Sequence, residues 1–174
     1  MAFRPLTDDD LPLLHGWLND PGVVRWWEGD DVSWDGVVRT YGADRPPDGV
    51  EHWLALVDDR PVGWIQCYAA AESPEEAEAW FIRGVDPTAA GIDYLVGEPS
   101  ARGQGLGSAM LAAFVDDVVF GRHPHWTQAA ASPYVANAAS WGALARAGFR
   151  HVADLPPHPG DDDGPARLMV RDRS

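Results

Sequence analysis

The sequence predicts a mixed α/β fold in one domain spanning residues 1–174. Three observations carry this prediction: an early β-hairpin pattern, a glycine-rich loop between a strand and an amphipathic helix, and a length that suits one hydrophobic core. Hydrophobic residues make up 45% of the chain and charged residues 23%, which is the composition of a globular protein.

The N-terminal part of the chain is expected to be mainly helical. A helix is predicted over residues 7–18, because a threonine caps it, acidic residues fill its first turn and apolar residues recur near the helical period. The Asn-Asp-Pro-Gly sequence at residues 19–22 ends this helix. A loop and a short helix are expected over residues 26–41, and residues 44–49 form a turn-rich connection.

The central part of the chain is expected to form strands. Residues 52–57 and 62–68 are predicted to pair as a hairpin across a turn. An acidic stretch at residues 73–78 precedes a further short strand that we predict over residues 80–82. The next predicted strand covers residues 91–96 and leads toward the glycine-rich loop.

The C-terminal part alternates helices and strands. A helix with an apolar face is predicted to start at the glycine-rich loop, and a later helix ends at Gly148, a typical residue beyond a helix C-terminus. The expected elements after the loop are the helix over residues 106–119, the strand over 126–131, the helix over 137–147 and the strands over 149–153 and 166–170.

The glycine-rich loop is Arg102-Gly103-Gln104-Gly105-Leu106-Gly107. Glycines leave backbone N–H groups uncovered and the helix N-terminus adds a partial positive charge, so the loop suits a pyrophosphate group. A nucleoside-triphosphate loop needs a lysine, which the chain lacks, and the third glycine comes one residue early for a dinucleotide loop. Coenzyme A is the remaining cofactor, and a plain glycine-rich turn is the alternative interpretation.

The charge balance favours a cationic ligand. Asp and Glu total 27 and Lys and Arg total 13, which gives a formal net charge of −14. Such a surface repels nucleic acid and attracts cations, although it can also serve solubility alone. No apolar run reaches the ~18–20 residues of a membrane span, no secretory signal is visible and one cysteine excludes an internal disulfide, so we expect a cytoplasmic protein.

The glycine loop and the segments after it resemble the GNAT acetyltransferase superfamily. The matching features are Arg102-x-x-Gly105-x-Gly107 between a strand and a helix, Asn137 at the start of a later helix, and Gly148-Phe149 at its end. The resemblance implies the GNAT (acyl-CoA N-acyltransferase) fold, a mixed and mostly antiparallel sheet with a V-shaped splay and flanking helices.

Further segments resemble the aminoglycoside 6′-N-acetyltransferases. These segments are Trp17-Leu18-Asn19 with Trp26-Trp27, Pro61-Val62-Gly63 with Gln66 and Tyr68, Asp86-Pro87 before Gly91-Ile92-Asp93, and Asp163-Gly164-Pro165-Ala166. The resemblance makes Asp93 the residue at the reaction centre. It also implies that the aminoglycoside cleft is lined by Trp27, Tyr41, Tyr68, Glu78 and Asp93.

The same resemblance implies the contacts of the co-substrate acetyl-CoA. Backbone groups near Leu95 and Val96 would pair with the acyl-pantetheine arm and donate to the carbonyl, Asn137 would contact that arm or shape its own helix start, and the loop would hold the pyrophosphate. The implied acetyl-CoA residues are Leu95, Val96, Arg102, Gly103, Gln104, Gly105, Leu106, Gly107, Ser108 and Asn137.

The chemistry of Asp93 follows from its place in a strand. Asp93 shares a strand face with Leu95, because side chains two residues apart point the same way. With an unperturbed pKa of ~3.9 it is a weak base, so we expect it to anchor the incoming ammonium group and accept its proton directly or through water. A capping or turn aspartate is the alternative. Glu78 and acids among Asp161–Asp163 are expected to add to an acidic cleft, unless that run is only a solvated loop.

Two positions depart from the family pattern. Leu144 occupies the place of the tyrosine that protonates the leaving thiolate in many GNAT enzymes, so Tyr134 or Tyr94 would replace it or the thiolate would leave unaided. Related transferases often carry Asp-Pro where this chain has Ser132-Pro133, which removes one expected carboxylate contact.

Other residues are expected to be structural, apart from Trp26 and Trp27, which are binding candidates because they lie in a loop. Cys67 is expected to be an inert packed thiol, and Trp53 and Trp64 are expected in the core. The histidines lack zinc-motif spacing, so we expect loop histidines and no metal; they are His123, His125, His151 and His158.

The sequence thus predicts acetyl-CoA-dependent N-acetylation of an aminoglycoside at the 6′-amine, an activity that confers antibiotic resistance. We expect a polycationic small-molecule substrate, no nucleic-acid or membrane partner, and a monomer or homodimer. A transferase acting on a siderophore-type side-chain amine is the alternative enzyme. A catalytically inactive acyl-CoA-binding module is the alternative from another class.

Overall fold

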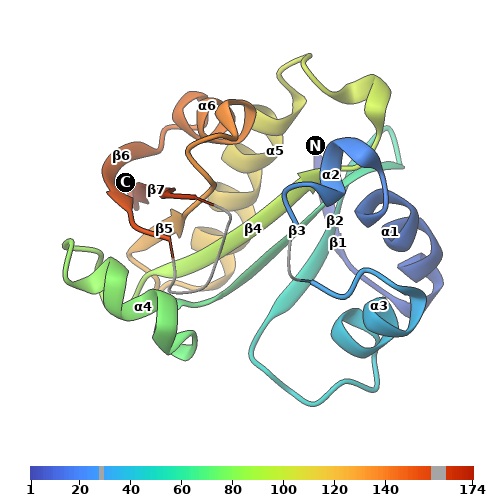
Figure 1. Cartoon of the computed structure of the whole chain (residues 1–174), viewed down its shortest axis with the longest axis horizontal. Helices are drawn as coiled ribbons and strands as arrows, with labels where there is room; N and C mark the ends of the chain where they lie inside the picture. The colour runs from blue at the N-terminus through green and yellow to red at the C-terminus, as the bar shows by residue number, and fades with distance from the viewer. Residues whose placement is uncertain (28–29, 158–163) are drawn as a thin grey trace.

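The computed structural model describes residues 1–27, 30–157 and 164–174. Its sheet has seven strands in the order β1-β2-β3-β4-β5-β7-β6 (Figure 1). Neighbouring strands are antiparallel except β4 and β5, which are parallel. Among the described residues, no helix is both long and apolar enough to cross a membrane.

Strands and helices are interspersed along the chain. The strands are β1 (Ala2–Pro5), β2 (Glu51–Val57), β3 (Arg60–Ala69), β4 (Ala90–Val96), β5 (Gln128–Ala131), β6 (Arg150–Leu155) and β7 (Ala166–Asp172). The α-helices are α1 (Leu11–Leu18), α2 (Pro21–Val24), α3 (Trp34–Tyr41), α4 (Pro74–Phe81), α5 (Leu106–Phe114) and α6 (Ala138–Arg146). A π-helical turn over Val115–Phe120 extends α5.

The two parallel strands separate after a short paired segment. Backbone pairing between β4 and β5 is confined to Ala90 with Ala129 and Gly91 with Ala130. β5 ends at Ala131, whereas β4 continues to Val96. The strands therefore open like a V, which confirms the predicted splay in a mixed, mostly antiparallel sheet.

Helices cover both faces of the sheet (Figure 1). On one face, Leu111 and Phe114 of α5 and Leu144 of α6 pack against apolar residues of β3 and β4, among them Ile65 and Ile92. On the other face, α1 and α3 pack against Leu54, Trp64 and Leu95. Because strand side chains alternate between faces, Gln66 and Asp93 lie on the α1 and α3 side.

One predicted strand is wrong and one strand was missed. Trp80 and Phe81 belong to the helix α4 and Ile82 caps its end, so residues 80–82 are not a strand. A strand would place Trp80 and Ile82 on one face, but Trp80 is 1% exposed and Ile82 is 73% exposed. The missed strand is β1, whose four residues are too few to show a reliable alternation.

Candidate active site

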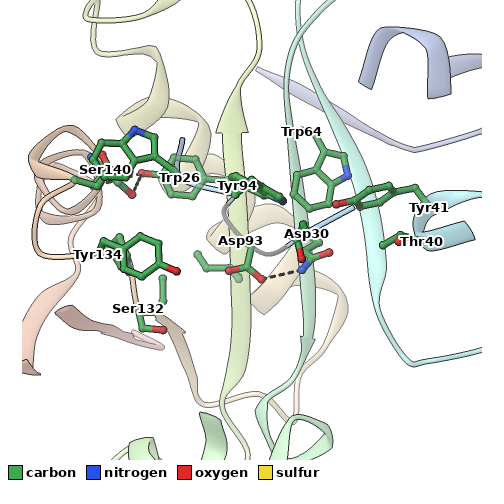
Figure 2. A pocket seen from close by; sticks show the side chains of 16 residues that line it. Trp26, Asp30, Thr40, Tyr41, Trp64, Asp93, Tyr94, Ser132, Tyr134 and Ser140 are labelled. Atoms are coloured by element: carbon green, nitrogen blue, oxygen red, sulfur yellow. Dashed lines mark hydrogen bonds between the residues drawn. The ribbon is translucent and has the colours of Figure 1, made fainter. Parts of the chain in front are cut away.

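The opening between β4 and β5 holds two adjoining clefts of about 450 and 350 Å³. Their linings share five residues: Trp26, Trp27, Tyr94, Asn137 and Ser140. The acidic cleft is further lined by Asp30, Thr40, Tyr41, Trp64, Gln66, Ile92, Asp93, Ala131, Ser132, Pro133 and Tyr134 (Figure 2). The glycine-loop cleft is further lined by Gly22, Val23, Arg25, Leu95, Val96, Arg102, Gly103, Gly105, Gly107, Ser108, Ala139, Ala143 and Arg146.

The acidic cleft joins negative charge with aromatic rings. Asp30 and Asp93 are its charged residues, and none of its described lining residues is basic. Its aromatic residues are Trp26, Trp27, Tyr41, Trp64, Tyr94 and Tyr134. Carboxylates attract organic cations and aromatic rings cover apolar faces of a ligand, so this cleft suits a polar cation.

Asp93 lies on β4 at the floor of the acidic cleft. Its Oδ2 accepts a hydrogen bond from Gln66 Nε2 at 2.8 Å, and Gln66 lies beside it on β3 (Figure 2). Burial is the main cause that raises the pKa of Asp93, the charge of Asp30 raises it further, and hydrogen bonds from Gln66 and Tyr68 oppose the shift. The expected unperturbed pKa is therefore corrected upward, and Asp93 is a stronger base than a solvated aspartate.

The aromatic wall of the cleft is built around Trp64. The rings of Trp27 and Tyr41 meet Trp64 edge-on, with centroids 6.1 and 5.4 Å away. His52 stacks on Trp64 with ring centroids 5.7 Å apart, and desolvation lowers the pKa of His52 to about 4, so its ring is neutral at pH 7. The structure thus brings the predicted Trp27 and Tyr41 to the site, and Trp64, expected only in the core, supports both.

Two predicted cleft residues lie elsewhere. Tyr68 is buried and is absent from the lining, and it acts on the site through its hydrogen bond to Asp93. Its ring also explains Gly91, because a Cβ there would lie 2.4 Å from ring carbons. Glu78 is exposed on α4 and lines neither cleft. The acidic run Asp161–Asp163 lies outside the described residues.

The glycine loop shapes the second cleft by its backbone. Gly103 and Gly105 have φ of +75° and +81°, which glycine adopts without strain, and Gly105 is the N-cap of α5. The first N–H groups of a helix lack intrahelical acceptors, so those of Leu106, Gly107 and Ser108 and the helix dipole form an anion site. The Gln104 side chain instead donates to the Ser100 carbonyl at 2.5 Å.

Arg102 is engaged within the protein. Its guanidinium donates to the Val96 carbonyl at 2.9 Å, to the Gly97 carbonyl at 2.7 Å and to Asp20 Oδ1 at 2.6 Å. These hydrogen bonds connect the start of α2 to the end of β4. The Arg102 side chain therefore stabilises the wall of the cleft.

Two other arginines face the glycine-loop cleft. Arg25 lies over the Trp26 ring at 4.7 Å, and Arg146 donates to Ser108 Oγ at 3.1 Å. Neither belongs to the loop motif, and sequence reasoning did not identify them. Positively charged side chains beside free helix N–H groups complete a site for phosphate groups.

Some backbone N–H groups of β4 point into the opening between β4 and β5. Gly97 N–H donates to Val62 on the β3 side, and the Val96 carbonyl accepts from Arg102 on the other side. Since backbone groups alternate along a strand, Tyr94 and Val96 face the opening and Leu95 faces β3. Of the backbone N–H groups expected to act near Leu95 and Val96, that of Val96 therefore faces the opening and that of Leu95 does not, while the Tyr94 N–H also faces it.

The structure also shows where Asn137, Leu144 and the two candidate proton donors, Tyr94 and Tyr134, lie. Asn137 Oδ1 accepts from Ser140 N–H at 3.2 Å, so it caps α6 while lining both clefts. Leu144 is fully buried in the core. The Tyr94 hydroxyl lies 2.9 Å from Ser140 Oγ, and burial raises the pKa of Tyr94 to about 12. The Tyr134 hydroxyl points toward the space in front of Asp93 (Figure 2).

Comparisons with known proteins agree with this geometry. The chain is 29% identical to the aminoglycoside N(6′)-acetyltransferases type 1 of Klebsiella pneumoniae and Serratia marcescens, over 99% of this chain and 83% of each relative. A solved structure of AAC(6′)-Ib with paromomycin and acetyl-CoA has a TM-score of 0.82 at 29% identity, over 99% of this chain and 93% of that chain. A complex of the same enzyme with coenzyme A and kanamycin has a TM-score of 0.80 at 28% identity, over 99% and 94%.

More distant structures share the fold. An aminoglycoside N(6′)-acetyltransferase from Legionella pneumophila has a TM-score of 0.71 at 18% identity, over 97% of this chain and 90% of that chain. The model of the acetyltransferase (GNAT) domain matches residues 7–155. The chain therefore belongs to the GNAT acetyltransferase family.

Proposed function

We propose that this protein transfers the acetyl group of acetyl-CoA to the 6′-amine of an aminoglycoside. The observation that carries the proposal is the position of Asp93. Its half-buried carboxylate lies in an acidic, aromatic cleft that adjoins a glycine-loop cleft in the same opening of the sheet. The names of the relatives support the same reaction.

The acidic cleft would hold the acceptor. An aminoglycoside is a polycationic sugar, so Asp30 and Asp93 attract its ammonium groups while Trp27 and Tyr41 cover sugar faces. Ser132 stands where related transferases often carry an aspartate, and Asp30 supplies a carboxylate from another part of the lining.

The glycine-loop cleft would hold acetyl-CoA. Free N–H groups at the start of α5 would bind the pyrophosphate, and Arg25 and Arg146 would balance its charge. The acyl-pantetheine arm would run along the open edge of β4. In this arrangement the thioester would lie where the two clefts adjoin, close to Asp93 in the acidic cleft.

The reaction then needs two proton movements. The ammonium group of the acceptor gives its proton to Asp93, directly or through water, and the neutral amine attacks the thioester carbonyl carbon. The C–N bond forms while the backbone N–H of Tyr94 or Val96 stabilises the oxyanion. The C–S bond then breaks, and the attacking nitrogen gives up its second proton. This proton passes to the departing thiolate (thiol pKa near 8.5), either after the thiolate has left unaided or through Tyr134, which donates to the sulfur and takes up the proton from the nitrogen.

A thiol-release assay tests the proposal. Purified protein with acetyl-CoA is offered kanamycin, tobramycin, amikacin or gentamicin, and product mass spectrometry locates the acetyl group. The proposal predicts release with at least one of them, acetylation at the 6′-amine, and loss of turnover in Asp93→Asn. No release from a protein that still binds coenzyme A would instead favour a siderophore-type amine or an inactive acyl-CoA-binding module.

A further inference from the structure

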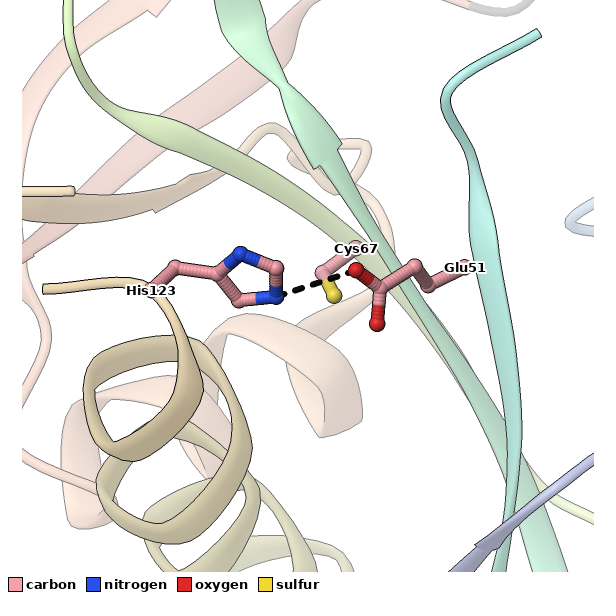
Figure 3. A group of neighbouring side chains, drawn as sticks. All are labelled: Glu51, Cys67 and His123. Carbon is pink, nitrogen blue, oxygen red and sulfur yellow. Dashed lines mark ion pairs between the residues drawn. The ribbon is translucent and has the colours of Figure 1, made fainter. Parts of the chain in front are cut away.

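A second cluster of chemically active side chains lies away from both clefts. Glu51 begins β2, Cys67 lies near the end of β3, and His123 follows the helical segment that extends α5 (Figure 3). Glu51 and Cys67 are register partners across the hairpin. Cys67 packs in the core on the sheet face opposite Gln66, so this cluster is separated by the sheet from the acidic cleft.

The three side chains converge on one point. One ligand atom of each residue, the Glu51 carboxylate oxygen, Cys67 Sγ and a ring nitrogen of His123, lies within 4.8 Å of the other two. A tetrahedral metal site brings such atoms to roughly 3.3–3.8 Å of each other, so small side-chain rotations suffice. The Trp126 ring stacks on His123 at 3.9 Å and orients the imidazole.

The cluster is incompletely satisfied as it stands. His123 Nε2 lies 3.0 Å from a Glu51 carboxylate oxygen, yet it is buried and makes no well-directed hydrogen bond within the described parts of the chain. A bound cation would give His123 Nε2 a partner, and it accepts electron pairs from nitrogen, oxygen and thiolate sulfur, the three atom types that meet here.

We infer that Glu51, Cys67 and His123 form a Zn²⁺ site. One thiolate, one imidazole and one carboxylate are ligands that Zn²⁺ accepts, and a water molecule would complete four-coordination. On binding, the thiol proton of Cys67 passes to solvent as the Zn–S bond forms. The cluster lies near the surface, because the Glu51 and His123 side chains are 38% and 20% exposed, whereas Cys67 is buried.

The ion would tie together three segments that are distant in sequence. It would join the paired ends of β2 and β3 to the chain just beyond the extension of α5. Ligand binding to the folded state alone stabilises that state by mass action, so Zn²⁺ raises the thermal stability of the protein. A Zn²⁺ site here departs from the sequence expectation of an inert Cys67, a loop His123 and no metal, because the three ligands lie at positions 51, 67 and 123 and share no local motif.

The test is metal titration of reduced protein from which every affinity tag has been removed. Zn²⁺ binding is measured by calorimetry, and Co²⁺ serves as a coloured substitute whose sulfur-to-cobalt absorption reports a thiolate ligand. Wild-type protein should bind one ion at this site with that absorption and melt at a higher temperature. Cys67→Ala and His123→Ala should each weaken binding more than about 100-fold and abolish the absorption.

The matched control is His125→Ala. His125 is exposed and its ring lies 5.9 Å from that of His123, yet it is not one of the three ligands, so this variant should bind as the wild type does. Circular dichroism checks that each variant is folded. The inference is overturned if wild-type protein shows no thiolate absorption with Co²⁺, or if Cys67→Ala and His123→Ala bind Zn²⁺ as tightly as wild type.

Discussion

The two clefts of the splay differ in how they are built and in the charge that they present. The glycine-loop cleft uses backbone N–H groups and the arginines Arg25 and Arg146, so it suits an anion. The acidic cleft uses Asp30, Asp93 and aromatic side chains, so it suits a cation. The net charge of −14 belongs to the whole chain and does not show that one cleft is positive and the other negative. This local separation of charge is what favours binding an anionic and a cationic ligand side by side.

The largest difference between the clefts should appear when Asp93 is neutralised. Asp93→Asn should lower kcat by about 10²–10⁴-fold, because the acceptor amine loses its proton acceptor. It should not lower stability, because burial already penalises the charged carboxylate. Steady-state kinetics, calorimetric binding of coenzyme A and thermal melting check these outcomes, and a variant with full activity would contradict the role.

His52, which stacks on the cleft residue Trp64 but does not itself line the cleft, should make the fold sensitive to moderate acid. Its folded-state pKa of about 4 lies below the unfolded value of 6.5, so the unfolded state takes up a proton first as the pH falls. Stability should therefore drop by about 3 kcal/mol between pH 6.5 and pH 4.

The variant His52→Phe supplies the control for this prediction. It keeps a ring against Trp64 but cannot be protonated, so its unfolding free energy should lose this part of the pH dependence. Urea unfolding at several pH values measures the unfolding free energy of both proteins. Asp10, whose hydrogen bond with Arg4 lowers its pKa to about 2, acts only at lower pH, between 3.8 and 2. Equal pH slopes in both proteins would contradict the burial of a neutral His52.

The glycine-loop cleft should respond to backbone strain instead. Gly105→Ala forces a Cβ onto φ +81° at the start of α5, which costs about 1–2 kcal/mol, so KM for acetyl-CoA should rise about tenfold. KM for the acceptor should stay near its wild-type value.

Gly84→Ala is the matched control for the loop. Gly84 has φ +86° and, like Gly105, open space where a Cβ would lie, but it lines neither cleft. Both variants should melt at a lower temperature, and Gly105→Ala alone should change the acetyl-CoA dependence. Equal kinetic effects would mean that the loop geometry is not specific to the cofactor.

The sequence predicted the two clefts unequally, for a physical reason. The glycine-loop cleft depends on a contiguous motif, so Gly103 and Gly105 were found, whereas lining residues outside the motif, such as Arg25 and Arg146, were missed. Most of the helices and strands follow from periodicity, whereas α4 was partly taken for a strand because its buried Trp80 ends a short amphipathic segment.

The acidic cleft depends on side chains from distant segments. Asp93, Trp27 and Tyr41 were predicted through a family resemblance, but nothing local marks Asp30 as a cleft residue, and Glu78 lies on the exposed side of a helix. Such residues become visible only when the splay brings their segments together.

The charge separation itself is tested most directly by measuring KM for both substrates in Asp30→Asn and Arg146→Gln. Both residues are exposed at the cleft edges, so solvent screens their charges and changes of a few fold are expected. The account predicts that Asp30→Asn raises KM for the aminoglycoside alone and that Arg146→Gln raises KM for acetyl-CoA alone. Variants that change both constants together, or neither, would contradict a division of the splay into a cation cleft and an anion cleft.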